Sequence, residues 1–223
     1  MNNESGNAFL YILIAVVLFG ALMFAISKSS DQDDSTGELS QGREAVAVNE
    51  ILSYAATTTN ALTQLQATHV QNDQIDFMLP SDANFNVAPN IYKIFHPDGG
   101  GLNYRALPKL AIEDDSVDPV PGYYVGRFNN VEWTPSTTPD ILFVAYEIKT
   151  SVCEAINKKL TGSTTIPTVS GSPLEDFFID DTLHVGTNAD FMVANCAACE
   201  EVAALCVQDA GGKNVFYSLL EAE

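Results

Sequence analysis

Basic residues are the scarcest feature of this sequence. Its 223 residues include 10 Lys and Arg against 29 Asp and Glu, which gives a formal net charge of −19. Phosphate backbones are bound by clustered Lys and Arg side chains, so the composition argues against nucleic acid as a partner. The same deficit disfavours a peripheral protein that rests on anionic lipid.

Common enzyme motifs are lacking as well. The chain contains no P-loop, dinucleotide-binding fingerprint or metalloprotease motif, and it has three histidines, His69, His96 and His184. His96 and Asp98 precede three successive glycines. This segment is a candidate catalytic or metal-binding loop, but glycines that permit positive φ are more typical of a simple turn. We therefore expect no enzymatic activity, and a tethered enzyme using His96 and Asp98 is the weakest alternative.

The N-terminus contains a long apolar run. No charged residue occurs between Ser5 and Ser27, and the strongly apolar part covers the 19 residues 8–26. As a helix it would be about 28 Å long, close to the hydrocarbon thickness of a bilayer. A helix that is apolar on every side requires lipid or the interior of a bundle. The run therefore predicts a membrane helix, with the acidic remainder outside the cytoplasm.

Three interpretations of this run remain open. Ala25, Ile26 and Ser27 would suit a cleaved secretory signal, although the first six residues contain no Lys or Arg. A plain signal anchor is the second interpretation. The third is a processed leader, because Gly6 is followed directly by Asn7 and then by the apolar residues 8–15.

The third interpretation rests on a family resemblance. Gly6, Asn7 and the apolar residues after them resemble the start of a type IV pilin or pseudopilin. The resemblance implies cleavage between Gly6 and Asn7 and a filament core built from the helix that follows. Two positions depart from the family pattern: Tyr11 stands where a Glu is usual, and the leader carries Glu4 instead of a basic residue. The residues implied in assembly are Phe9, Ile12, Leu13, Val16, Val17, Gly20 and Phe24.

The rest of the chain predicts an α+β fold in which a helical stalk precedes a small antiparallel sheet. Apolar residues at three- and four-residue spacing predict a helix over 38–70. We expect a strand over 91–95, a hairpin of 123–128 with 131–133, a strand or helix start over 141–148, a helix over 151–160 and a hairpin of 202–207 with 214–220. The predicted parts are a polar leader (1–6), the apolar helix (7–28), an acidic linker (29–37), the stalk (38–79) and an extracytoplasmic domain (80–223).

Four cysteines allow three disulfide pairings. In an oxidising compartment we expect Cys196 to pair with Cys199 and Cys153 with Cys206. The alternatives are a redox-active Cys196–Cys199 pair and a zinc site that adds Cys206 and His184.

Acidic clusters at 114–118 and 180–181 provide the oxygen ligands that calcium prefers, but not at a recognised calcium-loop spacing. No cofactor is predicted, and calcium, which pseudopilins commonly hold, is the alternative.

These observations predict a structural subunit of a pilus-like extracellular filament. The subunit would sit in the inner membrane before assembly and on the cell surface afterwards, with copies of the chain as its partners. The alternative is a single-pass, membrane-anchored periplasmic or surface domain that binds a ligand without polymerising.

Overall fold

The computed structural model describes residues 35–113 and 116–222. The chain divides into two compact units, Met1–Arg43 and Glu44–Glu223. The predicted leader, the apolar helix 7–28 and its assembly residues lie outside the described part. Within that part, no helix is both long enough and apolar enough to cross a bilayer.

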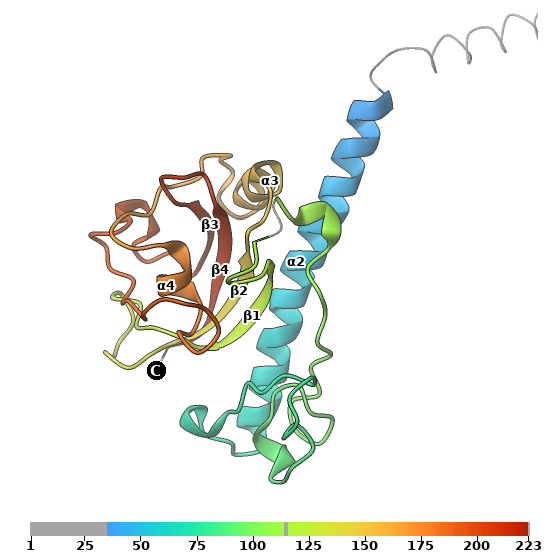
Figure 1. Cartoon of the computed structure of the whole chain (residues 1–223), viewed down its shortest axis with the longest axis vertical. Helices are drawn as coiled ribbons and strands as arrows, with labels where there is room; N and C mark the ends of the chain where they lie inside the picture. The colour runs from blue at the N-terminus through green and yellow to red at the C-terminus, as the bar shows by residue number, and fades with distance from the viewer. Residues whose placement is uncertain (1–34, 114–115, 223) are drawn as a thin grey trace, which may run out of the picture. The chain divides into compact units, whose positions relative to one another are not determined.

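The longest described element is α2, which covers Ser35–Ala67 (Figure 1). Ile51, Leu62 and Leu65 are each at most 1% exposed and belong to the hydrophobic cluster that α2 shares with one face of the sheet. The Tyr54 ring makes the direct contact, with the rings of Tyr123 in β1 and Phe143 in β2. Each such leucine or isoleucine contributes roughly 1.5–3 kcal/mol on burial. The threonines of α2 remain helical because their hydroxyls bond to the carbonyl four residues earlier, as in Thr58 to Tyr54 at 2.8 Å.

The sheet has four antiparallel strands in the order β1-β2-β4-β3. Its strands are β1 (Gly122–Arg127), β2 (Ile141–Tyr146), β3 (Ala204–Gln208) and β4 (Asn214–Glu221). The described chain is therefore an α+β fold with a small antiparallel sheet, as the sequence predicts.

Each face of the sheet is covered by a separate hydrophobic cluster. Phe143 and Ala145 of β2 point into the cluster formed with α2, whereas Val144 and Tyr146 point into the opposite one. This alternation follows from the two-residue period of a strand. All six residues of β2 are buried because the strand is central and covered on both sides. Figure 1 shows the sheet between α2 and α4.

Shorter helices complete these two layers. They are α3 (Thr150–Thr161), α4 (Leu174–Phe178) and the 3-10 turns Asn72–Gln74, Asn90–Tyr92, Lys109–Ala111 and Ala197–Cys199. α3 ends at Gly162, whose φ of 82° is readily adopted only by glycine. The structure contains the expected disulfides Cys153–Cys206 and Cys196–Cys199, which are compatible with an oxidising compartment.

Three local predictions differ from the structure. The hairpin of 123–128 with 131–133 is wrong, because β1 pairs with β2 instead. The predicted strand over 91–95 is also wrong, because that segment contains the end of a 3-10 turn and a single isolated bridge, between Lys93 and Asp76. The helix of the stalk ends at Ala67 rather than at residue 70, and the only helical segment over 68–79 is the turn Asn72–Gln74.

Candidate functional site

The two edge strands of the sheet, β3 and β1, differ in how far other segments cover their outer backbone. The edge at β3 is covered by Asn157 of α3, whose side-chain amide accepts a hydrogen bond from the Cys206 N–H and donates one to the Cys206 carbonyl, both at 2.8 Å. The segment before α4 adds further bonds, from Val169 N to Gln208 O and from Gln208 N to Pro167 O. Sheet edges are commonly covered in this way because their unpaired backbone groups attract other strands.

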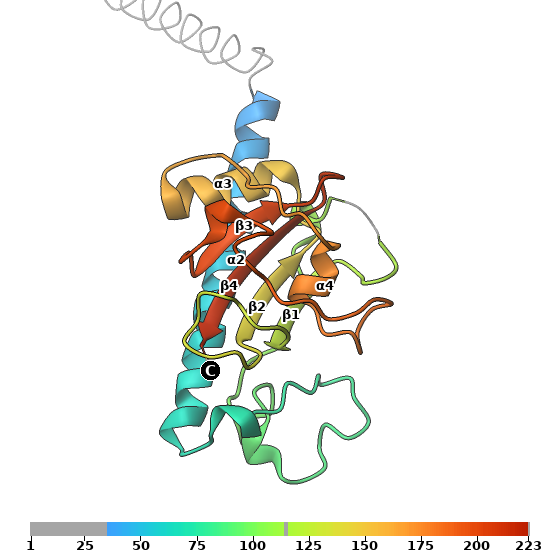
Figure 2. The ribbon, with the colours of Figure 1, turned by 90° about the vertical axis from the view of Figure 1, so that its left-hand side faces the viewer.

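The edge at β1 is not covered in this way. In the described part of the chain, neither a second strand nor an isolated bridge pairs with the outer backbone of β1 (Figure 2). A groove of about 730 Å³ runs along this edge. We call it the β1 groove. Its lining comes from β1 and Phe128, the segments 77–79 and 81–82, Tyr104, the preceding residues Val120 and Pro121, and Asp180, Thr182 and Leu183.

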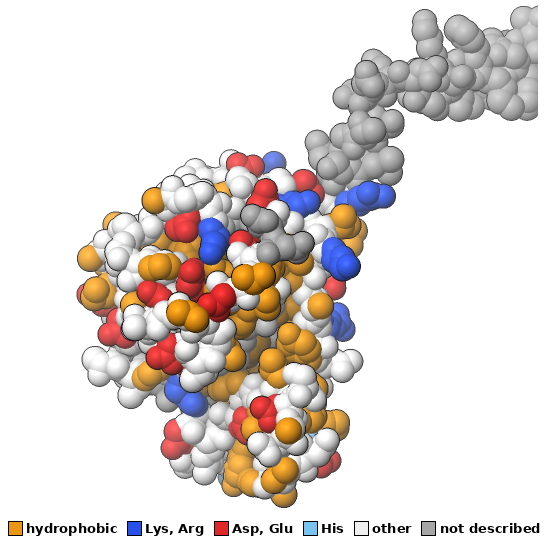
Figure 3. All heavy atoms as spheres, in the orientation of Figure 1, with side chains coloured by type: hydrophobic (Ala, Val, Ile, Leu, Met, Phe, Trp, Pro, Cys, Tyr) orange, Lys and Arg blue, Asp and Glu red, His pale blue; other side chains and the backbone are white. Residues whose placement is uncertain are grey.

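The β1 groove exposes apolar side chains. Val120 is 57% exposed, Leu183 49% and Tyr104 43%. Val117 and Val185, which are close in sequence to the lining residues, are even more exposed. In Figure 3, hydrophobic side chains gather over β1 and the loops beside it. Exposed apolar side chains gathered beside a sheet edge are candidates for contact with another molecule.

The charged side chains of the groove are mainly acidic. Asp82 and Asp180 both line it. The Oδ1 atoms of these carboxylates accept bonds from their own loops, from Asn84 N at 2.8 Å and from Thr182 N at 2.9 Å. The guanidinium of Arg127 donates to the Asn72 carbonyl and lies 6.0 Å from the centre of the Phe77 ring. The one cation that lines the groove is thus held against its wall.

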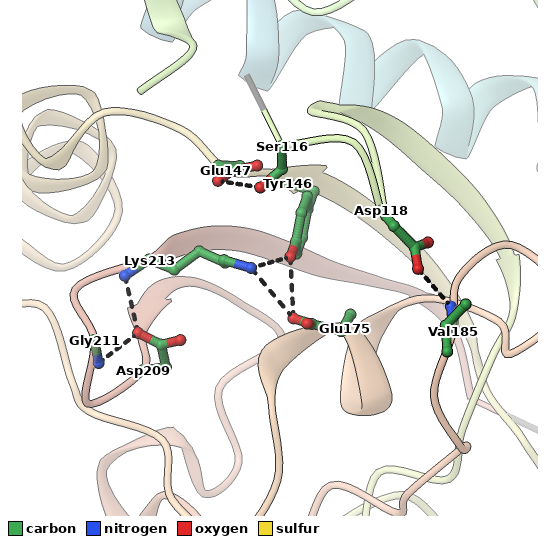
Figure 4. A network of polar contacts seen from close by, with 9 residues as sticks. All are labelled: Ser116, Asp118, Tyr146, Glu147, Glu175, Val185, Asp209, Gly211 and Lys213. Atoms are coloured by element: carbon green, nitrogen blue, oxygen red, sulfur yellow. Dashed lines mark hydrogen bonds and ion pairs between the residues drawn. The ribbon is translucent and has the colours of Figure 1, made fainter. Parts of the chain in front are cut away.

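Two hydrogen bonds fix segments that adjoin the groove. Val185 N donates to the Asp118 carboxylate at 3.0 Å and so joins the loop after α4 to the segment before β1 (Figure 4). The Tyr124 hydroxyl donates to the Val120 carbonyl at 2.6 Å. Burial, followed by the nearby Tyr104 and Asp118, raises the pKa of Tyr124 to about 12. The raised pKa extends the pH range in which the phenol keeps the proton for this bond into alkaline solution.

A buried lysine organises the loop that forms the lower wall. Lys93 is 3% exposed, and its ammonium group donates to three carbonyl oxygens at 2.6–3.0 Å, those of Asn84, Phe85 and Val87. Gly100 packs against the neighbouring backbone, where an added Cβ would meet the Ile94 carbonyl at 2.6 Å. The glycines after Asp98 thus allow a close backbone approach.

A second polar cluster lies outside the groove (Figure 4). The Tyr146 hydroxyl donates to Glu175 at 3.0 Å and accepts from the Lys213 ammonium at 2.7 Å. Burial and the adjacent carboxylate raise the pKa of Tyr146 far above its usual value. The cluster ties β2, α4 and the turn before β4 together, which is a structural task.

The structure assigns local roles to the other candidate residues. His96 is 8% exposed, and its Nδ1 accepts a bond from Asp98 N at 3.1 Å, which closes the turn on itself. The zinc alternative is wrong, because its three cysteines form disulfides. Among the described residues, no group of His, Cys, Asp and Glu could hold a metal ion. Asp114 and Asp115 of the calcium alternative, and Gly6 and Asn7 of the cleavage site, lie outside those residues.

Sequence reasoning missed the residues of the β1 groove. They come from three separate parts of the chain, 77–104, 120–128 and 180–183, and no periodic signal connects them. Comparisons of the chain with protein-family models, with curated proteins and with solved structures each gave no match. Functional inference therefore rests on the residues and their geometry.

Proposed function

We propose that this protein is a structural subunit of a pilus-like filament. Its apolar residues 7–28 would lie in the membrane before assembly and pack against the same segments of other copies afterwards. An apolar helix that leaves lipid needs another dry environment, and neighbouring helices provide one. The acidic domain would then form the outer surface of the filament.

The observation that supports this proposal best is the packing of α2. The apolar run is followed by a helix of 33 residues whose buried stripe, including Ile51, Leu62 and Leu65, shares a hydrophobic cluster with one face of the antiparallel sheet. A pilin-like architecture requires this combination of a helical stalk and a sheet. The Cys153–Cys206 disulfide, which lies near the C-terminus, is a further point of agreement with the family resemblance.

Electron microscopy of sheared cell-surface material tests the proposal. We expect filaments that contain the wild-type chain and none from the Val17→Asp variant, because a charge at mid-membrane costs at least ~2.5 kcal/mol. Val46→Asp is the matched control, since Val46 is 63% exposed on α2 and its replacement should leave filaments intact. Normal filaments from Val17→Asp would contradict the proposal.

The second candidate function is a membrane-anchored domain that binds a partner and does not polymerise. The β1 groove favours it, because an exposed apolar groove beside an open sheet edge is suited to ligand binding. Partner binding in the groove is also compatible with a filament subunit, since the groove and the N-terminal segment use different residues.

A further inference from the structure

We infer that the β1 groove binds an extended peptide segment of a partner protein, apolar at alternate positions and basic between them. The segment adds to the sheet as a fifth strand beside β1. This inference names the partner class for the binding function proposed above. It does not depend on filament assembly, because all its residues lie in Glu44–Glu223.

The first support is the contrast between the two sheet edges. At β3, the side-chain amide of Asn157 bonds to both backbone groups of Cys206, as a neighbouring strand would. At β1, the described chain places a groove where such a cover would lie. An extended peptide can bond to the free backbone groups of an exposed edge, and side-chain pockets then select its sequence.

The second support is the size of the groove. β1 has six residues, so a partner strand of equal length would extend about 20 Å. The loops carrying Leu79 and Leu183 line the groove together with the edge strand. The groove volume of about 730 Å³ is in the range that takes one small ligand or a short chain segment. The edge of a second copy would bring its own loops into the same space. The occupant is therefore one extended segment.

The third support is the chemistry of the walls. Val120 and Leu183 offer half-exposed apolar surface to alternate side chains of the incoming strand. Asp82 and Asp180 offer carboxylates, and the whole chain carries a formal charge of −19. Opposite charge speeds encounter and suppresses wrong partners, so basic residues are favoured between the apolar ones and an acidic strand is rejected.

Gly126 of β1 is covered by a neighbouring aromatic ring. Its missing side chain is replaced by the Phe128 ring, which an added Cβ would meet at 2.6 Å. Glycine within a strand often marks a place where another backbone approaches closely. Here the ring stabilises one face of the strand, and the strand still offers its backbone edge to a partner.

The test uses the full chain in lipid nanodiscs and a fluorescent peptide of eight residues in which valine and lysine alternate. We expect saturable binding by fluorescence anisotropy and slower hydrogen exchange of β1 amides in the complex. The Leu183→Gln variant, which removes apolar surface without adding charge, should bind about tenfold more weakly, a change that corresponds to about 1.4 kcal/mol. Leu160→Gln is the matched control, because Leu160 of α3 is 43% exposed and does not line the groove.

Peptide variants separate strand addition from other modes of binding. In a strand, backbone and side-chain directions both alternate. The backbone N–H groups of the valines and of the lysines therefore point to opposite sides of the peptide. N-methylation of the residue type whose N–H groups face β1 should abolish binding, whereas N-methylation of the other type should not. Equal binding of both would overturn strand addition and leave a groove that binds through side chains alone. A glutamate-for-lysine peptide that binds as well as the original would overturn the basic preference.

Two outcomes would overturn the inference as a whole. One is the absence of saturable binding of the valine–lysine peptide, which would also count against the binding function of the groove. The other is the formation of a dimer of this chain that Leu183→Gln disrupts and Leu160→Gln does not, which would make a second copy the occupant of the groove. Filament formation tests neither outcome, so the two proposed functions can fail separately.

Discussion

Asn157 provides a sharp test of how the β3 edge is stabilised. Its buried side chain makes three hydrogen bonds, two to the backbone of Cys206 at 2.8 Å and one to the Thr165 carbonyl at 2.9 Å. At about 1 kcal/mol for each bond, Asn157→Ala should lower the free energy of unfolding by about 3 kcal/mol. The replacement also leaves the Cys206 N–H without its side-chain acceptor, which adds to the loss.

Urea denaturation followed by circular dichroism measures this change. Asn60→Ala is the matched control, because Asn60 is exposed on α2 and alanine is the better helix former, so stability should stay the same or rise by a few tenths of a kcal/mol. Asn157→Asp should destabilise at least as much as alanine, because a carboxylate cannot donate to two carbonyl oxygens. A loss below about 1 kcal/mol for Asn157→Ala would refute the reasoning.

Three further predictions address the remaining supports of the fold. Cys206→Ser opens a disulfide between residues 53 apart and should lower the free energy of unfolding by roughly 4 kcal/mol, with faster proteolysis of the C-terminal hairpin; unchanged protease resistance would count against it. Gly100→Ala should destabilise the protein by about 1–3 kcal/mol, because the added Cβ would collide with the Ile94 carbonyl. Gly42→Ala, in open space on α2, should stabilise it by up to about 1 kcal/mol. Thermal melts that shift in the same direction for both variants would be inconsistent with this packing. Burial raises the pKa of Tyr54 and Tyr124 to about 12. Between pH 10 and 12 the unfolded state therefore binds fewer protons than the folded state, and the free energy of unfolding should fall as pH rises. A free energy of unfolding that stays constant over this pH range would argue against the burial of these phenols.

Long and periodic features were predictable from the sequence. The spacing of Ile51, Leu62 and Leu65 identified α2 to within three residues at each end, and the glycines at 211–212 identified the β3–β4 hairpin. The sequence of 141–148 is compatible with either a strand or a helix start because β2 is buried on both faces, which removes the alternation that distinguishes a strand.

Features fixed by distant contacts were not predictable. Asn129 lies between the two segments of the predicted hairpin 123–128 and 131–133, but its side chain donates to the carbonyls of Asp176 and Phe177. The Asp140 carboxylate accepts from Val131 N at 2.8 Å and holds the same loop from the other side. These contacts divert the chain after β1, so the partner strand begins only at Ile141. The short helix α4 has five residues, too few for a periodic signal.

The candidate site could not be predicted either, because it too depends on contacts between residues distant in the sequence. The apolar character of 91–95 suggested a strand, whereas Lys93 holds the loop through carbonyl groups that no sequence pattern reveals. The β1 groove exists because this loop, the loop with Leu183 and the edge strand come together. The exposure of Val120 and Leu183 is likewise a property of the folded chain.

The mature N-terminus tests the central functional claim most directly. Mass spectrometry of the chain from sheared surface material and from membranes gives this terminus. Prepilin-type processing and assembly predict a chain that begins at Asn7 in both fractions. A chain that begins at Lys28 and is recovered as a free monomer would contradict both the anchor and the filament.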